Sequence, residues 1–538
     1  MRIKIFHFPL SIFHFLTLRL CVSAVLFAFV SCSSPPTDLR TFVPADALVY
    51  LETSDLGKTL NALTESQVFQ DAAKKTPDFS ALNGMQVAVA VTGFEASENQ
   101  VTAENSVLNF KPRFVAIADT RTWNRYTLQF TEERLGEFVN ETYGGEVSLD
   151  TSDKAGGKSF VWTAKDGRKV FAFVAGSRIF FSNDETALEK SLAVFRGEAD
   201  SLIKNESLAK MRETAQSALA FGYVSTDGIA QISNLAGVST AMDATDDEEG
   251  RSFIARVLPQ ILRGSVKELF WTATKTEAGI EDKYSISLTP ETASVVKETL
   301  VPATQNQSSL AEILPSDAFS LTRYNLQNPQ IAWRSLLLVA GKNTDAMSAK
   351  ILIAFSGSLL EPYGVADTET FLSAVDSEIW TAAFDAEGDK SAAIVIVKDA
   401  EKLKKSIAEI NFKVAGEKLE NAEVWKSADG TNAAAFIDNK LILGDAESVL
   451  KCLQTKQNGQ NFANSAAWKK FSETNAVAVT YGRDATEKTI DVLSERKTEN
   501  AQMLTVFTTE TRFNASGIER KTVSPFGLLG RILAQFDD

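Results

Sequence analysis

The chain has 538 residues, of which 44% are hydrophobic and 23% charged, a composition typical of a folded protein. This length exceeds one typical hydrophobic core and predicts two or three domains. The formal net charge of −14 at pH 7 disfavours nucleic acid as a partner, because its phosphate backbone is also negative.

Residues 1–31 are typical of an export signal. Arg2 and Lys4 form a basic start, and an apolar run extends from Cys21 to Val30. About ten strongly apolar residues suit the core of a signal peptide and fall short of the roughly 20 that span a bilayer. Counted from Ile5 the run is longer, so an uncleaved membrane anchor is an alternative interpretation.

The signal ends in Phe29-Val30-Ser31-Cys32, which resembles a bacterial lipobox. The resemblance implies that the signal is removed before Cys32, which then becomes the lipidated N-terminus and holds the protein on a membrane. Residues 32–41 include Pro35 and Pro36 and are predicted to form a tether. A plain secretory signal with an incidental cysteine is the alternative.

Both histidines of the chain, His7 and His14, lie in the predicted signal. A mature chain without histidine excludes Ser-His-Asp and Cys-His nucleophile systems and histidine-ligated zinc or iron. Cys452 would be its only unmodified thiol. We therefore predict no catalytic residue, no metal site and no cofactor site.

The opening "VPADALVYLETSDLGKTL" from Val43 predicts a turn, a strand and a helix. This stretch is similar to the start of a group of exported, uncharacterised bacterial proteins that open with a Pro-Ala-Asp strand motif. The resemblance would cover most of residues 40–530. It implies an envelope location and no established activity, so no catalytic residue is carried over from it.

The stretch "DKAGGKSFVW" (153–162) combines glycines with Lys158 and Ser159, as phosphate-binding loops do. Such a loop opens a helix, whereas these residues lead into Phe160-Val161-Trp162, a strand-like run. The pattern therefore favours a strand over a nucleotide site.

The chain repeats itself. The stretch "VWTAKDGRKVFAFVAGSRIFFSNDETALEKSL" begins at Val161, and "VWKSADGTNAAAFIDNKLILGDAESVLKCL" begins at Val424. Each predicts a hairpin, within residues 169–182 and 433–443, because alternating apolar residues flank a two-residue turn. Asp184 and Asp445 then stand where a helix N-cap is expected.

Further matches extend the repeat in both directions. Pro44-Ala45-Asp46 corresponds to Pro315-Ser316-Asp317, and Gly279-Ile280-Glu281 to Gly517-Ile518-Glu519. We therefore predict two α+β repeat domains over residues 42–300 and 311–530, joined by residues 301–310. Each is expected to be a mainly antiparallel sheet covered by helices.

The sequence favours a lipid-anchored protein of the bacterial cell envelope, exported and membrane-anchored, that binds or scaffolds and is not an enzyme. Its expected partners are the membrane, through the lipid anchor, and an envelope protein. An envelope hydrolase using carboxylates is one alternative, because carboxylate chemistry needs no histidine. A carrier of an apolar ligand is the other.

Overall fold

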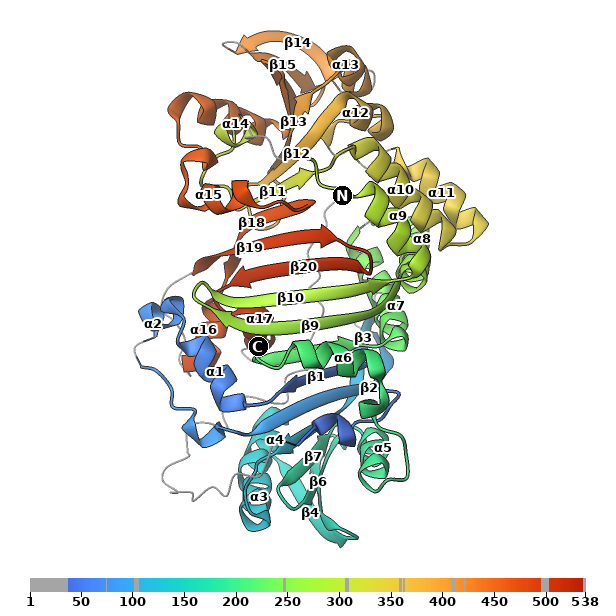
Figure 1. The fold of residues 1–538 in the computed structure, drawn as a ribbon, viewed down its shortest axis with the longest axis vertical. Helices are drawn as coiled ribbons and strands as arrows, with labels where there is room; N and C mark the ends of the chain where they lie inside the picture. The colour runs from blue at the N-terminus through green and yellow to red at the C-terminus, as the bar shows by residue number, and fades with distance from the viewer. Residues whose placement is uncertain are drawn as a thin grey trace.

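The computed structural model describes residues 37–73, 75–100, 106–244, 248–304, 309–357, 360, 363–408, 412–419, 422–494 and 503–535. The predicted signal and Cys32 lie outside the described residues. Within the described part the fold is α+β, with one large antiparallel sheet, and Figure 1 shows its strands stacked along the long axis of the molecule.

The strands divide into two sets of ten along the chain. The first set is β1 (Val49–Thr53), β2 (Gln86–Gln100), β3 (Ser106–Asp119), β4 (Val147–Lys154), β5 (Gly157–Ala164), β6 (Lys169–Ala175), β7 (Arg178–Ser182), β8 (Ala220–Val224), β9 (Val266–Thr276) and β10 (Gly279–Leu288). The second set is β11 (Ser320–Asn325), β12 (Val375–Ala383), β13 (Ser391–Val397), β14 (Phe412–Leu419), β15 (Ala422–Ser427), β16 (Asn432–Ile437), β17 (Lys440–Asp445), β18 (Ala478–Ala485), β19 (Leu504–Phe513) and β20 (Gly517–Ser524).

The helices connect these strands. In the first half they are α1 (Leu56–Thr64), α2 (Gln67–Ala72), α3 (Asn124–Phe130), α4 (Gly136–Thr142), α5 (Glu185–Phe195), α6 (Glu206–Thr214), α7 (Thr226–Ala244), α8 (Glu248–Ser265) and α9 (Pro290–Thr299). In the second half they are α10 (Pro329–Lys342), α11 (Ala346–Ser356), α12 (Thr368–Ala374), α13 (Ala400–Ala408), α14 (Ala446–Asn458), α15 (Ala466–Glu473), α16 (Glu487–Ser494) and α17 (Gly527–Ala534).

The two sets of strands pair in the same order. The first half runs β4-β5-β6-β7-β3-β2-β1-β8-β9-β10, and the second runs β14-β15-β16-β17-β13-β12-β11-β18-β19-β20. Strands β10 and β20 then pair antiparallel and join the halves. The result is one continuous sheet, where the sequence predicted two. The joint pairs backbone groups that two separate sheets would leave exposed at an edge.

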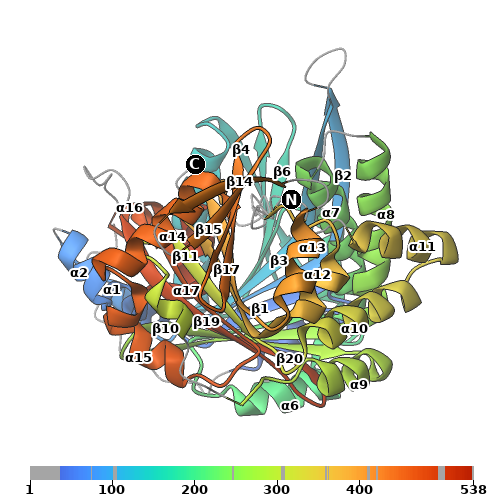
Figure 2. The same ribbon diagram turned by 90° about the horizontal axis from the view of Figure 1, so that it is seen from above.

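The sheet twists strongly from its centre to its ends. The outer strands β4–β7 and β14–β17 turn away from the direction of the central strands β9, β10, β19 and β20 (Figure 2). Such rotation is the accumulated right-handed twist of neighbouring strands.

Helices cover both faces of the outer parts of the sheet. Ala90 and Val115 belong to a core cluster with α5 and α6, whereas the adjoining Val91 and Phe114 belong to a cluster with α4. Alternate residues of a strand point to opposite faces, so two apolar layers enclose these strands. The second half is layered in the same way, with Ile394 and Val395 in different clusters.

The core at the centre is shared between the halves. Helices α16 and α17 of the second half, with the residue that precedes α17, contribute to a cluster that also holds Trp271 and Ile280 of the first half. The contributed residues are Ile490, Leu493, Phe526 and Leu533. Conversely, α9 of the first half packs against Phe513 and Ile518, in β19 and β20. The chain therefore does not bury its central core as two separate units.

The local predictions for the repeated stretch are confirmed. Strands β6 and β7 form one hairpin and β16 and β17 another, with Gly176 and Asp438 in their turns at φ 65° and 53°. Asp184 accepts a hydrogen bond from the amide of Ala187 at 2.8 Å, and Asp445 from that of Ser448 at 2.9 Å. Each carboxylate caps its helix, an interaction worth about 1 kcal/mol.

Residues 157–164 form strand β5, paired with β4 and β6. Lys158 and Ser159 therefore lie in a sheet and do not open a helix, as the sequence predicted.

Residues 37–42 differ from the flexible tether predicted for residues 32–41. Leu39 is 2% exposed and begins a short 3-10 helix, Leu39–Phe42, capped by Asp38. The ring of Phe42 packs edge-on against that of Phe180. This short segment buries enough apolar surface to be fixed on the sheet, although its polar flanks suggest a linker.

Candidate functional site

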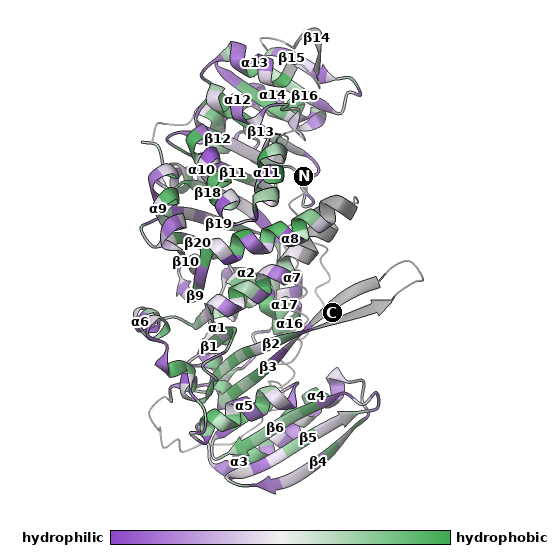
Figure 3. Cartoon of the chain, turned by 90° about the vertical axis from the view of Figure 1, so that its right-hand side faces the viewer, coloured by the Kyte–Doolittle hydropathy of each residue, from purple (hydrophilic) through white to green (hydrophobic). Residues whose placement is uncertain are grey.

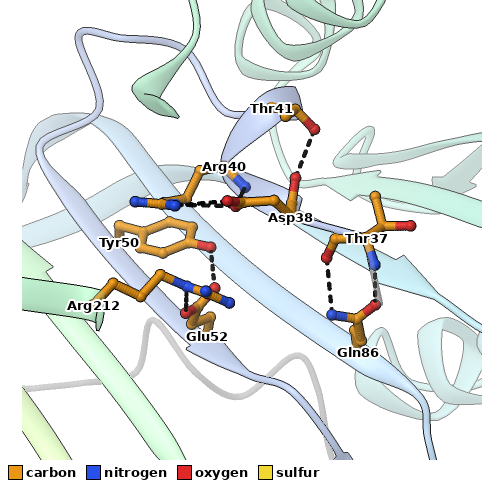
Figure 4. Close-up of polar contacts among 8 residues, drawn as sticks. All are labelled: Thr37, Asp38, Arg40, Thr41, Tyr50, Glu52, Gln86 and Arg212. Atoms are coloured by element: carbon orange, nitrogen blue, oxygen red, sulfur yellow. Dashed lines mark hydrogen bonds and ion pairs between the residues drawn. The ribbon is translucent and has the colours of Figure 1, made fainter. Parts of the chain in front are cut away.

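Cys32, the predicted lipid attachment residue, lies outside the described residues. The described chain begins five residues later, at Thr37, on the ends of two neighbouring strands. The backbone amide of Thr37 donates to Oε1 of Gln86, and Nε2 of Gln86 donates back to the Thr37 carbonyl, both at 2.9 Å (Figure 4). The Thr37 hydroxyl donates to Asp119 Oδ2 at 2.9 Å. Three hydrogen bonds therefore fix Thr37, the first described residue, on this end of the two strands.

The next residues form an ion pair at the same place. Arg40 donates to both oxygens of Asp38, through Nε at 3.0 Å and Nη2 at 2.6 Å. Burial acts to raise the pKa of Asp38, but hydrogen bonds and charge from Arg40 outweigh it and hold the pKa below its ordinary value. Asp38 therefore stays ionised at neutral pH.

A buried polar cluster of Tyr50, Glu52 and Arg212 lies beside this pair, as Figure 4 shows. The Tyr50 hydroxyl donates to Glu52 Oε2 at 2.6 Å, and Arg212 Nε donates to Glu52 Oε1. Burial raises the pKa of Tyr50 well above its ordinary value, and the charge of Glu52 raises it further. The cluster joins α6 to β1, and both carboxylate oxygens of Glu52 are occupied by protein donors.

A second buried acid, Asp282 on β10, lies 2% exposed near the centre of the sheet. Its Oδ1 accepts from Nε1 of Trp271 at 2.9 Å, and its Oδ2 accepts from the amide of Leu528 at 2.7 Å. Burial raises its pKa to about 6 although both hydrogen bonds act to lower it. Asp282 thus fastens the first turn of α17 to the first half of the sheet.

The thiol of Cys452 is buried. Cys452 is 0% exposed, and burial raises its pKa to about 12. A thiol of this kind is a poor nucleophile, because the thiolate is the reactive form. The described residues also contain no group of three histidine, cysteine, aspartate or glutamate side chains placed to hold a metal ion.

Several large apolar side chains are exposed on helices α10 and α11. They are Ile331, Leu336, Leu338, Met347 and Ile353. The two helices pack against each other at the side of the molecule, and Figure 3 shows the apolar character of α11. Among the described residues, Trp123, outside this pair of helices, is the most exposed large apolar residue, at 72%. None of the helices in the described part of the chain has the length and apolarity that crossing a bilayer requires.

Sequence reasoning identified none of the buried polar contacts. Glu52 and Arg212 are 160 residues apart, and Asp282 and Leu528 are 246 apart, so no local pattern links them. One signal was present. Tyr50 and Glu52 are two residues apart in β1, and such residues point to the same face of a sheet. Trp162 and Trp425, which occupy equivalent positions in the two copies of the repeat, are both buried.

Comparison with known proteins gives no family for this chain. No protein-family model and no curated protein matches it. Two solved structures of the protein TP0453 are similar in part. Crystal form IV is 11% identical, with a TM-score of 0.25, over 49% of this chain and 85% of that one. Crystal form I is 9% identical, with a TM-score of 0.23, over 44% of this chain and 100% of that one.

Proposed function

We propose that the chain is a lipid-anchored protein of the bacterial cell envelope that acts by binding or scaffolding. The observation that carries the proposal is the position of Cys32. It follows a signal-like apolar run and a lipobox-like tetrapeptide, and it precedes the docked residue Thr37 by only five residues. A lipid there would hold the folded part close to a membrane, and two or three acyl chains give stable anchoring without a spanning helix.

The state of the buried acids favours binding over catalysis. Glu52 and Asp282 each have both carboxylate oxygens occupied by fixed donors of the protein, as does Asp119, which is 3% exposed. A hydrolase that uses carboxylates needs an acid whose oxygen reaches the substrate. These acids instead join segments of the chain to each other. They therefore support a structural role for the most buried carboxylates.

We infer further that the two halves arose by duplication of one α+β unit. The strand order is the same in both, and equivalent contacts recur. Lys190 pairs with Asp46 at 2.7 Å, and Lys451 pairs with Asp317 at 3.0 Å. The motifs quoted from the sequence place these four residues at equivalent positions.

The joint between the halves has the symmetry that such a duplication implies. Lys283 stands opposite Lys521, and these two are equivalent when the Gly-Ile-Glu motifs are superposed. Around this pair, Lys283 contacts Glu519 at 2.8 Å and Lys521 contacts Glu281 at 3.4 Å. A half-turn exchanges one of these ion pairs with the other. Such reciprocal contacts are typical of two copies that meet through the same surface.

Metabolic labelling with an alkyne fatty acid tests the anchor. We expect the wild-type chain to incorporate label and to fractionate with membranes, and Cys32→Ala to lose both. The matched control is Cys21→Ala, which changes a cysteine of the signal and leaves the predicted attachment residue intact. Equal labelling of Cys32→Ala and wild type would overturn the proposal.

A further inference from the structure

The position of Thr37 restricts where a protein anchored at Cys32 can face a membrane. Thr37 is fixed by hydrogen bonds to Gln86 and Asp119, at one end of β2 and β3. Thr37 lies five positions after Cys32, and an extended chain covers at most about 3.6 Å per residue. An acyl group on Cys32 would therefore enter a bilayer within roughly 20 Å of this end of the sheet.

The loop between β3 and α3 lies at this same end. Asp119 accepts the Thr37 hydroxyl on Oδ2 and the backbone amide of Arg121 on Oδ1, the latter at 3.0 Å. The Asp119 carboxylate thus bonds both to Thr37 and to the start of the loop. Thr120 adds two hydrogen bonds to the Ser177 carbonyl, at 2.9 Å from its amide and 3.0 Å from its hydroxyl. These contacts fix the position of the loop relative to Thr37.

The loop presents aromatic side chains to solvent. Trp123 is 72% exposed and Tyr126 is 39% exposed, three residues apart at the start of α3. Exposure of a tryptophan is unfavourable in water, and tryptophan and tyrosine are enriched where proteins meet the headgroup region of a bilayer. The charged residues of this loop and of the first turn of α3 are Arg121 and Arg125, both cations in a chain whose net charge is −14. The acids Glu132 and Glu133 follow about two turns later.

We propose that the surface formed by Trp123, Arg125 and Tyr126 lies against the lipid bilayer that holds Cys32. This inference rests on the proposed lipid anchor and adds an orientation to it. The lipid anchor supplies most of the free energy of binding to the bilayer, and the aromatic side chains insert into the headgroup region beside it. Two neighbouring points of contact then restrict how the protein can rotate on the membrane.

The exposed apolar residues of α10 and α11 are the competing candidate for a bilayer contact. Met347 is 69% exposed, almost as much as Trp123. In Figure 1, α10 and α11 lie at the upper right of the molecule, whereas α3, which begins just after Trp123, lies near its lower end. A label on α11 is therefore the matched control.

The test uses the full acylated chain on phosphatidylcholine vesicles. Asn124→Cys and Met347→Cys each place one exposed thiol for an environment-sensitive fluorophore, and Asn124→Cys leaves both aromatic residues in place. Cys452 is buried and protonated at neutral pH, so it is not labelled. Flotation with the vesicles reports the anchor, and the emission of the fluorophore reports the surface in contact.

We expect both variants to float, with a blue shift and a several-fold rise in emission at position 124 and no change at position 347. Adding Trp123→Ala to the Asn124→Cys chain should reduce the shift without abolishing flotation. Flotation with no shift at position 124, or with an equal shift at position 347, would overturn the orientation and leave the anchor standing. Failure of acylated wild type to float would overturn both.

Discussion

Asp282 offers the most direct test of how the two halves are held together. Its carboxylate is buried between Trp271 and the first turn of α17, and burial raises its pKa from 3.8 to about 6. A shift of about two units corresponds to about 3 kcal/mol between the two protonation states. Since the folded pKa is the higher one, the native state binds the extra proton. This contribution to stability is full below about pH 4 and is lost as the pH rises through 6.

The perturbation is Asp282→Asn, which keeps the shape and removes the titration. Stability is measured by urea unfolding of both proteins from pH 4 to pH 8. The other acids titrate alike in both proteins, so their effect cancels in the difference. We expect the free energy of unfolding of Asp282→Asn to rise relative to wild type by about 3 kcal/mol across this range. A flat difference would refute the raised pKa. A change of the opposite sign would mean that Trp271 and the amide of Leu528 stabilise the anion more than burial destabilises it.

Three other predictions concern the Glu52–Arg212 pair, the first turn of α17 and the core shared between the halves. Arg212→Ala should lower the free energy of unfolding by about 3 kcal/mol, because it leaves the buried Glu52 without its cation. Adding Glu52→Gln should restore part of this loss in the same urea titrations, and no recovery would contradict the role of the charge. Gly527→Ala should cost about 1–3 kcal/mol, because the backbone stands at φ 61° and a Cβ would lie 2.7 Å from Asp282 Oδ2. The control is Gly430→Ala, because Gly430 has a similar φ of 74° but open space around it. If the two substitutions cost the same free energy of unfolding, crowding by Asp282 contributes nothing. A fragment of residues 307–538 should show no cooperative thermal transition by circular dichroism while the whole chain melts as one unit, and a fragment that unfolds cooperatively as a monomer would contradict the shared core.

The features that the sequence predicted are those set by neighbouring residues. The two hairpins follow from short turns between alternating strands, and the caps at Asp184 and Asp445 from the need of free helix amides for an acceptor. These signals act within about ten residues and keep their meaning in any tertiary setting. The α+β class follows from the mixture of hairpins and amphipathic helices.

The features that the sequence missed depend on contacts between distant segments. Nothing in the sequence of β10 shows that its partner is β20, because any exposed edge strand has the same unpaired backbone groups. The docking of residues 37–42 depends on Gln86 and Asp119, which are distant in sequence. The tether predicted for residues 32–41 rested on polar and proline-containing flanks and overlooked Leu39, which is buried.

The same reasoning explains why a duplicated sequence need not give two independent cores. When one copy has an edge strand equivalent to β10, two copies can pair through it by a half-turn, and that pairing also brings the next helix of each copy over the other. Helices α9 and α17 occupy these positions, each after the joining strand of its own half and each packed on strands of the other. Asp282 adds a contact with α17 on one side of this exchange only, because the residue at the equivalent place in β20 is Arg520. The two halves therefore match in topology and differ in the contacts that hold them, as expected if a symmetric joint was later stabilised asymmetrically.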